Sequence, residues 1–292
     1  MGDIFDRGDD DLPIQEWVYR LARDAGRTNG ALYSIMGNHE VMNALGDHSM
    51  ATRRAFLPFQ DLRPELDVLL GGDWSALGGF PEWARCRLVA MRPGGPVARL
   101  MAAHAVCMKV GDNLFVHAGL LPEHVRAGAA AAAAGEGAGR REGEGQSAIA
   151  NAEDVMRKLN LGASSWLLGN GPPPEELLEP EGPVWTRVYS DPDCRDIDQT
   201  ARAKLEETLR LTGAKRMIVG HTPQRAGINS AADGQVWRVD TGMTAMIGGR
   251  PEVLEIKGEE IVILTEHKPV AGSKRAARPP LPVADGEELR RQ

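Results

Sequence analysis

The chain has 292 residues, of which 42% are hydrophobic, and its 41 acidic residues exceed its 34 basic residues to give a net charge of -7. This length and apolar content suffice for one core, and we expect one domain with an embellishment. A negative surface repels nucleic acid and anionic membranes, and no apolar run approaches the roughly 20 residues of a membrane span. We therefore expect neither nucleic acid nor a membrane as a partner.

The first eight residues contain the pattern Gly-Asp-x-x-Asp-Arg-Gly, which places Asp3, Asp6 and Arg7 at fixed spacing. The acidic run at 9–11 leads into an apolar stripe with helical period, which stops before Gly26. The stripe predicts a helix with one apolar face, formed by Ile14, Trp17, Val18, Leu21 and Ala22.

The next apolar segments predict a strand, a helical region and a hairpin. Residues 31–36 read as a buried strand that ends at Gly37, and ligand sites in parallel α/β sheets gather at such strand ends. We therefore expect Asp3 and Asn38 to emerge at the same edge. Residues 50–105 suggest short helices joined by Gly/Pro turns, interpreted as a substrate-facing cap. The turn signal at 111–113 predicts a hairpin whose second strand delivers His117.

The second half of the chain begins with a low-complexity segment, 127–147, that is rich in Ala, Gly and Glu. We expect it to be a flexible surface insertion in a domain that spans 1–267, followed by a disordered tail at 268–292. The periodicity predicts a helix soon after residue 150 and a second helix over 198–211. It also predicts a strand at 217–219 that delivers His221, followed by three later strands at 236–239, 253–256 and 261–264.

Four residues spread along the chain offer suitable ligand atoms for metal ions: Asp3, Asn38, His117 and His221. Carboxylate and amide oxygens combined with imidazole nitrogens favour Zn, Fe or Mn over Ca or Mg. We expect two divalent metal ions as cofactors, with Asp3 between them. Such a pair activates water and neutralises charge in phosphate ester hydrolysis.

Beside these ligands, His39 directly follows Asn38, which predicts that it lies near the metals. A histidine there can donate a proton to the leaving group, and Asp6 is suited to orient it. Arg7 and Arg187 are candidates to clamp the phosphate oxygens, Arg187 on weaker grounds because an isolated arginine is often a packed surface residue. We expect Glu40 to support the loop.

The remaining histidines and the cysteines carry no motif. We interpret His48, His124 and His267 as surface residues and His104 as structural. The three cysteines are scattered and lack the spacing of metal ligands. We therefore expect buried thiols in a reducing compartment, at Cys86, Cys107 and Cys194. We expect a soluble intracellular protein, in the cytoplasm unless a segment ahead of Met1 carries a targeting signal.

Taken together and in this order, the motifs resemble the calcineurin-like metallophosphoesterases, in the phosphoprotein phosphatase branch. The sequences 6–9, 37–43, 117–120, 219–224 and 240–243 are most similar to the Shewanella-like protein phosphatases. The resemblance covers roughly 1–265, excluding the Ala/Gly insertion. It implies an α/β fold, the αββα metallophosphatase sandwich of two packed mixed β-sheets flanked by helices. It also implies a bimetal centre and hydrolysis of phosphoproteins at Ser/Thr or Tyr.

One motif of that family, Gly-Asp-x-His-Gly, is missing from the chain. It would supply the private ligands of the first metal, and the first strands of the sheet would accompany it. We therefore expect this sequence to be a fragment of a longer phosphatase.

Two alternatives stay open. A pseudophosphatase that binds phosphoprotein without turnover agrees with the missing motif, although His39, Asp6 and the arginines favour working chemistry. A diadenosine polyphosphate hydrolase shares the His-Ala-Gly form, although the continuation at 40–43 weighs against it.

Overall fold

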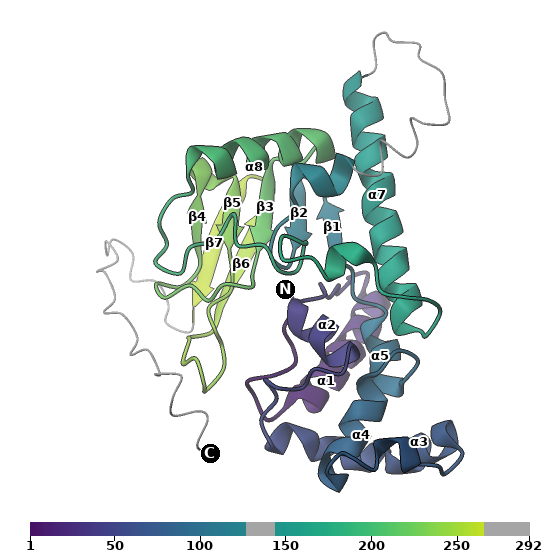
Figure 1. Ribbon diagram of the computed structural model, residues 1–292. Coiled ribbons are helices and arrows are strands. Elements are labelled where there is room, and N and C mark those ends of the chain that lie inside the picture. The colour runs from purple at the N-terminus through teal and green to yellow at the C-terminus, as the bar shows by residue number, and fades with distance from the viewer. Residues whose placement is uncertain (127–143, 266–292) are drawn as a thin grey trace, which may run out of the picture.

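The computed structural model describes residues 1–126 and 144–265 (Figure 1). A five-stranded mixed sheet has the order β1-β2-β3-β5-β4, in which β2, β3 and β5 are parallel neighbours and the two outer strands run antiparallel to their partners. A separate antiparallel hairpin forms the second sheet. The strands are β1 (Cys107–Val110), β2 (Asn113–Val116), β3 (Arg216–Val219), β4 (Asn229–Ala231), β5 (Val236–Arg238), β6 (Glu252–Lys257) and β7 (Glu260–Thr265).

The helices fall into two groups, one below the sheet in the view of Figure 1 and one against the sheet itself. The lower group contains α1 (Asp11–Ala25), α2 (Asn38–Ala44), α3 (Arg63–Leu70), α4 (Glu82–Met91) and α5 (Pro96–Met101). The second group contains α7 (Glu144–Leu167), which stands beside β1, and α8 (Gln199–Thr212), which runs above the sheet and contacts α7. The N-terminus lies between the groups, so the first motif is placed at their junction.

Two of the helix ends follow from their sequence. Asp198 precedes α8 and its carboxylate accepts a hydrogen bond from the Ala201 amide at 2.8 Å. This contact satisfies one of the free N–H groups of the first turn. Gly213 ends the same helix in the left-handed conformation, with φ of 63°, which costs glycine little.

Several predicted elements are confirmed. The helix that stops at Gly26, the short helices of 50–105, the hairpin before His117, the strand before His221 and the hairpin of β6 and β7 all form. The parallel strands β2 and β3 end side by side, so His117 and His221 emerge at one edge of the sheet. No helix in the described part of the chain is long and apolar enough to cross a membrane.

The predicted strand at 31–36 is wrong, because only Ile35 forms an isolated parallel bridge, to Ala105. Backbone hydrogen bonds from Met36 to Ala105 and from Ala105 to Ser34 support an extended segment there. A single bridge to one neighbouring segment provides too few interstrand hydrogen bonds to form a strand.

The apolar face predicted for α1 is only partly buried. Ile14 and Trp17 are 44% and 59% exposed, whereas Asp11, Leu12 and Gln15 are the buried residues of this helix. Asp11, at the start of the helix, forms an ion pair of 2.8 Å with the buried Arg87 of α4.

The boundaries of the insertion change as well. Helix α7 begins at Glu144, inside the segment expected to be irregular up to 147. Residues 127–143, and the tail 268–292 with its disorder prediction, lie outside the described residues. The mixed α/β class is thus observed, and the sandwich of two packed sheets stays a prediction.

Candidate active site

The motif that contains Asp3 approaches the motif that contains Asn38 so closely that only glycine fits between them. A Cβ atom on Gly37 would lie 2.2 Å from Asp3 Oδ1, and one on Gly2 would lie 2.5 Å from His117 Nδ1. Backbone conformations with positive φ are concentrated in the same loop and across the site, at Asp3, Asp6, Arg7 and His221. Strain of this kind is found at functional sites more often than elsewhere.

Glu40 joins the two motifs, as predicted for a supporting residue. Its carboxylate is fully buried and accepts hydrogen bonds from the backbone amides of Asp3, Ile4 and Gly37, at 2.9, 2.7 and 2.6 Å. Three charge-assisted bonds from one side chain fix the Asp3 loop against the start of α2.

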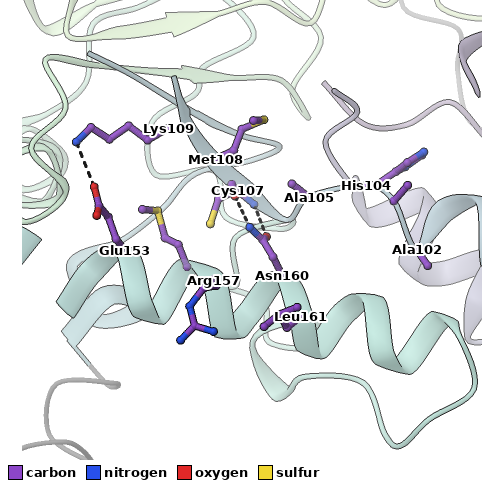
Figure 2. Close-up of a pocket in the computed structure, with 12 residues that line it drawn as sticks. Ala102, His104, Ala105, Cys107, Met108, Lys109, Glu153, Arg157, Asn160 and Leu161 are labelled. Atoms are coloured by element: carbon purple, nitrogen blue, oxygen red, sulfur yellow. Dashed lines mark hydrogen bonds and ion pairs between the residues drawn. The ribbon is translucent and has the colours of Figure 1, made fainter. Parts of the chain in front are cut away.

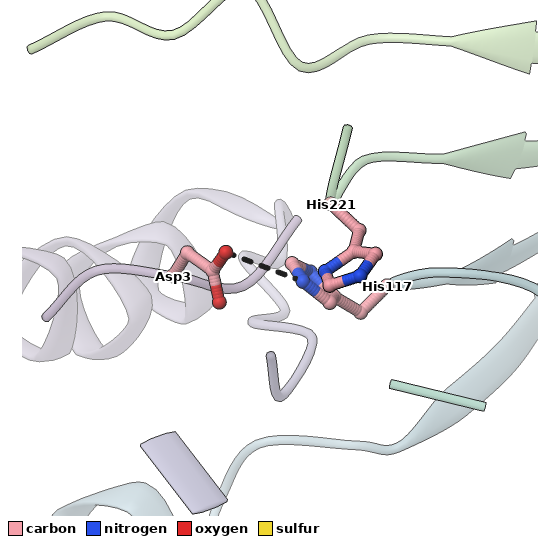
Figure 3. Close-up of side chains that lie close together, drawn as sticks. All are labelled: Asp3, His117 and His221. Carbon is pink, nitrogen blue, oxygen red and sulfur yellow. Dashed lines mark ion pairs between the residues drawn. The ribbon is translucent and has the colours of Figure 1, made fainter. Parts of the chain in front are cut away.

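Three of the four predicted metal ligands, Asp3, His117 and His221, lie close together (Figure 3), and the fourth, Asn38, contacts the two histidines. One potential ligand atom from each of Asp3, His117 and His221 lies within 4.8 Å of the other two. The side-chain oxygen of Asn38 lies 3.2 Å from His117 Nε2 and 2.9 Å from His221 Nδ1. Residues separated by more than a hundred positions in sequence thus converge on a space that one ion can fill.

The pKa values of the two histidines in this cluster are shifted in opposite directions. Burial, followed by the charges of His117 and Arg187, lowers the pKa of His221 to about 3, so this ring is neutral and can coordinate a cation. Burial also acts to lower the pKa of His117, but the nearby carboxylate of Asp3, 3.3 Å away, outweighs it and raises the pKa. A cation bound here would therefore compete with protons for His117.

His39 and Asp6 form the predicted pair. His39 Nδ1 lies 2.7 Å from Asp6 Oδ2, and both side chains are buried. Burial opposes the charge on His39, but the hydrogen bond to Asp6 and the charge of Asp3 raise its pKa above the ordinary value. The pairing leaves Nε2 of the ring available to other groups.

Two further residues hold Asp6, and neither was anticipated. Asn43 donates to Asp6 Oδ2 at 3.0 Å, and Arg87 donates to Asp6 Oδ1 at 3.1 Å. Asn43 lies one helical turn after His39, a spacing that would have placed both on one face of α2. Arg87 lies in no motif, and its sequence context gives no signal.

The two arginines occupy different environments. Arg7 is half-buried and lines the cavity that contains the cluster. Arg187 is exposed, and its guanidinium donates to the Thr222 hydroxyl at 2.8 Å, next to His221. The structure therefore brings Arg7 to the site and leaves Arg187 at its margin.

The cavity has a volume of about 700 Å³ and is open on one side. Its lining includes Asp3, His39, His117 and His221 together with an apolar wall at 243–247. Asp240 is another carboxyl group of the lining that sequence reasoning did not assign; burial and the charge of Asp3 raise its pKa.

Two histidines differ from expectation. His124 is buried and accepts a hydrogen bond from the Leu121 amide at 3.1 Å, and His48 is half-buried beside Asn43. His104 is structural, as expected, and lies 3.2 Å from the Gln15 side chain. His267 lies outside the described residues.

A second cavity, of about 450 Å³, lies between α7 and β1 (Figure 2). Asn160 spans the two elements through hydrogen bonds to the backbone of Val106 and Cys107, and Lys109 pairs with Glu153. Among the described residues, those that line this second cavity form no cluster of carboxylates and imidazoles like that of the first cavity.

No protein-family profile matches the chain. Shewanella-like protein phosphatase 2 of Arabidopsis thaliana is 30% identical, over 92% of this chain and 68% of its own length. Shewanella-like protein phosphatase 1 of Plasmodium berghei is 22% identical, over 83% of this chain and 56% of its own. The cold-active protein-tyrosine phosphatase of a psychrophile Shewanella species has a similar fold, with a TM-score of 0.54 and 20% identity over 90% of this chain and 64% of its own.

The named relatives are protein phosphatases. The chain belongs to the Shewanella-like protein phosphatase family, which confirms the family predicted from the motifs. It spans about two thirds of the length of the Arabidopsis relative and of the solved Shewanella enzyme.

Proposed function

We propose that the chain carries the active site of a metal-dependent phosphoprotein phosphatase, which hydrolyses phosphomonoesters of Ser/Thr or Tyr. The buried His39–Asp6 pair carries this proposal, because His39 and Asp6 line the same cavity as the potential metal ligands Asp3, His117 and His221, which Asn38 contacts. We infer that the sheet belongs to a metallophosphatase sandwich of the calcineurin-like type. Phosphorylated protein or peptide is the expected partner.

The donor set suits divalent metals of the Mn, Fe or Zn type. It combines one carboxylate, one amide oxygen and two imidazoles, one of which is neutral because of its lowered pKa. Asp3, Asn38, His117 and His221 would hold one ion, and Asp3 would be shared with a second. When bound, the metals would supply charge neutralisation and an activated water.

The other residues act on the phosphate and the proton. Arg7 lines the cavity, and a guanidinium there can bind phosphate oxygens through two parallel hydrogen bonds. Arg187 can do the same after release from Thr222. Asp6 orients His39, and its hydrogen bond favours the protonated ring that is needed to protonate the leaving oxygen.

The proposal is tested by phosphatase assays of the purified chain with Mn²⁺ on a phosphotyrosine and a phosphoserine peptide. We expect turnover that falls by about 100-fold or more in His39→Asn, the scale of general acid catalysis. His124→Asn is the matched control, because an amide oxygen there can still accept the Leu121 amide. Binding of phosphopeptide without turnover would support the pseudophosphatase alternative, and faster cleavage of diadenosine polyphosphate would support the dinucleotide hydrolase.

A further inference from the structure

Arg87, in the middle of α4, is a fully buried cation with an unusually complete set of partners. Its guanidinium donates to Asp11 at 2.8 Å, to Asp6 at 3.1 Å, to the Asn43 side-chain oxygen at 2.9 Å and to the Ala55 carbonyl at 3.2 Å. The rings of Phe5, Phe56 and Phe59 lie 5.0–5.8 Å from the guanidinium carbon. Burial of a charge at this depth requires such compensation.

These contacts divide the two oxygens of Asp6 between different tasks. Oδ2 faces His39 Nδ1 and the Asn43 amide, whereas Oδ1 is occupied by Arg87. Asp11 Oδ2 accepts from both the Asp6 amide, at 3.0 Å, and Arg87, so the backbone and the side chain of Asp6 are tied to one guanidinium. Asp6 itself has a positive φ of 75°, a backbone conformation that is uncommon for residues other than glycine.

We propose that Arg87 is a positioning residue, which rotates the Asp6 carboxylate so that Oδ2 meets His39 and thereby aims the His39 ring into the cavity. This inference rests on the proposed function of His39. A planar guanidinium is suited to the task because its N–H groups have fixed directions, so it can hold Asp6, Asp11 and Asn43 at once. Helix α4, in the region expected to be a cap, then serves as support for the proton donor.

A purely structural ion pair would explain the same burial, so the test must separate folding from proton transfer. Leaving groups provide that separation. Phenolate leaves with assistance from a proton donor, whereas dinitrophenolate is stable enough to leave with little assistance. A displaced His39 should therefore slow phenyl phosphate hydrolysis more than 2,4-dinitrophenyl phosphate hydrolysis.

The experiment compares wild type, Arg87→Met, Arg87→Lys and Arg85→Met. Arg85 is a half-buried arginine of α4 that donates hydrogen bonds to the backbone carbonyls of Phe80 and Gly78. We expect Arg87→Met to reduce kcat on phenyl phosphate by about 100-fold, within the range for general acid catalysis, with little change in KM. On dinitrophenyl phosphate the same variant should stay within about threefold of wild type. On phenyl phosphate, Arg87→Lys should lose less kcat than Arg87→Met, and Arg85→Met should lose none.

Proton NMR supplies a readout that does not depend on turnover. A proton between His39 Nδ1 and Asp6 should give a low-field resonance, assigned by its absence in His39→Asn. We expect Arg87→Met to abolish this resonance, Arg87→Lys to shift or broaden it, and Arg85→Met to preserve it.

Equal losses on both substrates, or an unchanged resonance in the Arg87 variants, would overturn the inference and leave Arg87 as a structural ion pair. Where Arg87→Met fails to fold, Arg87→Lys decides the matter, because it keeps the buried positive charge and removes only the planar fork. Failure of wild type to cleave any phosphomonoester would overturn the proposed function, and the NMR comparison would still decide whether Arg87 positions His39.

Discussion

At the scale of single residues, the pKa of His39 depends on burial and on its charged neighbours, Asp6 first among them. The hydrogen bond to Asp6 is the largest contribution that raises the His39 pKa against the effect of burial. A proton donor must carry its proton, so kcat should fall as the pH rises through the raised His39 pKa. We predict that Asp6→Asn lowers this pKa, which moves the basic limb of the pH profile to lower pH and reduces kcat by about tenfold or more.

Steady-state kinetics on a phenolic phosphate across the neutral and alkaline range measures both effects. Asp73→Asn is a suitable control, because this exposed carboxylate accepts a hydrogen bond from the Ser75 amide at 2.9 Å and does not line the cavity. A basic limb that stays in place in Asp6→Asn would show that another group controls it.

The sequence disclosed those residues that lie inside short motifs and missed those that reach the site from far away. Asp3, Asp6, Asn38 and His39 occur in two motifs whose spacing has a chemical meaning. Arg87 is 81 positions from Asp6 and 76 from Asp11, and nothing near it in sequence reveals those partners. Only the folded chain shows that a buried arginine completes the set.

At the scale of elements, hydrophobic period predicted helices better than it predicted their orientation. Helix α1 forms within the expected limits, yet Ile14 and Trp17 of its apolar stripe are exposed while Asp11 is buried in an ion pair with Arg87. The spacing of apolar residues predicts a helix but cannot reveal a buried ion pair with a residue far away in sequence. The strand expected at 31–36 failed for a related reason, since strand formation depends on neighbours that local sequence does not describe.

A testable consequence at this scale concerns the attachment of α7 to β1 (Figure 2). Asn160 accepts hydrogen bonds from the amides of Val106 and Cys107, at 2.8 and 3.2 Å, and donates to the Cys107 carbonyl at 2.8 Å. Its side chain thus satisfies the hydrogen-bonding capacity of backbone groups at the edge of the sheet. We predict that Asn160→Ala lowers the free energy of unfolding by about 2 kcal/mol, because buried polar groups lose their partners.

Urea denaturation measures this change, with Arg157→Ala as the control on the same helix. The Arg157 side chain is 62% exposed and pairs with Asp154, so its removal should cost about 0.5 kcal/mol or less. If Asn160→Ala lowers the unfolding free energy by no more than the control does, water replaces the lost hydrogen bonds.

At the scale of the whole molecule, the candidate metal ligands link parts of the chain that are otherwise joined by long connections. Asp3 belongs to the first loop, Asn38 begins α2, and His117 and His221 follow β2 and β3. The unfolded chain cannot bring these groups together, so a bound ion stabilises only the folded state. Ligand binding of this kind adds about 2.7 kcal/mol at a concentration 100 times the dissociation constant.

We therefore predict that Mn²⁺ raises the melting temperature by roughly 5 to 10 °C and that a chelator reverses the increase. His221→Ala should abolish the effect, whereas His124→Asn should retain it, because that residue lies outside the cluster. The increase should also shrink as the pH falls, since His117, whose pKa is raised by the Asp3 carboxylate, keeps a proton that the metal must displace. Differential scanning calorimetry at several pH values tests all three expectations, and an equal increase in His221→Ala would place the ion elsewhere on the molecule.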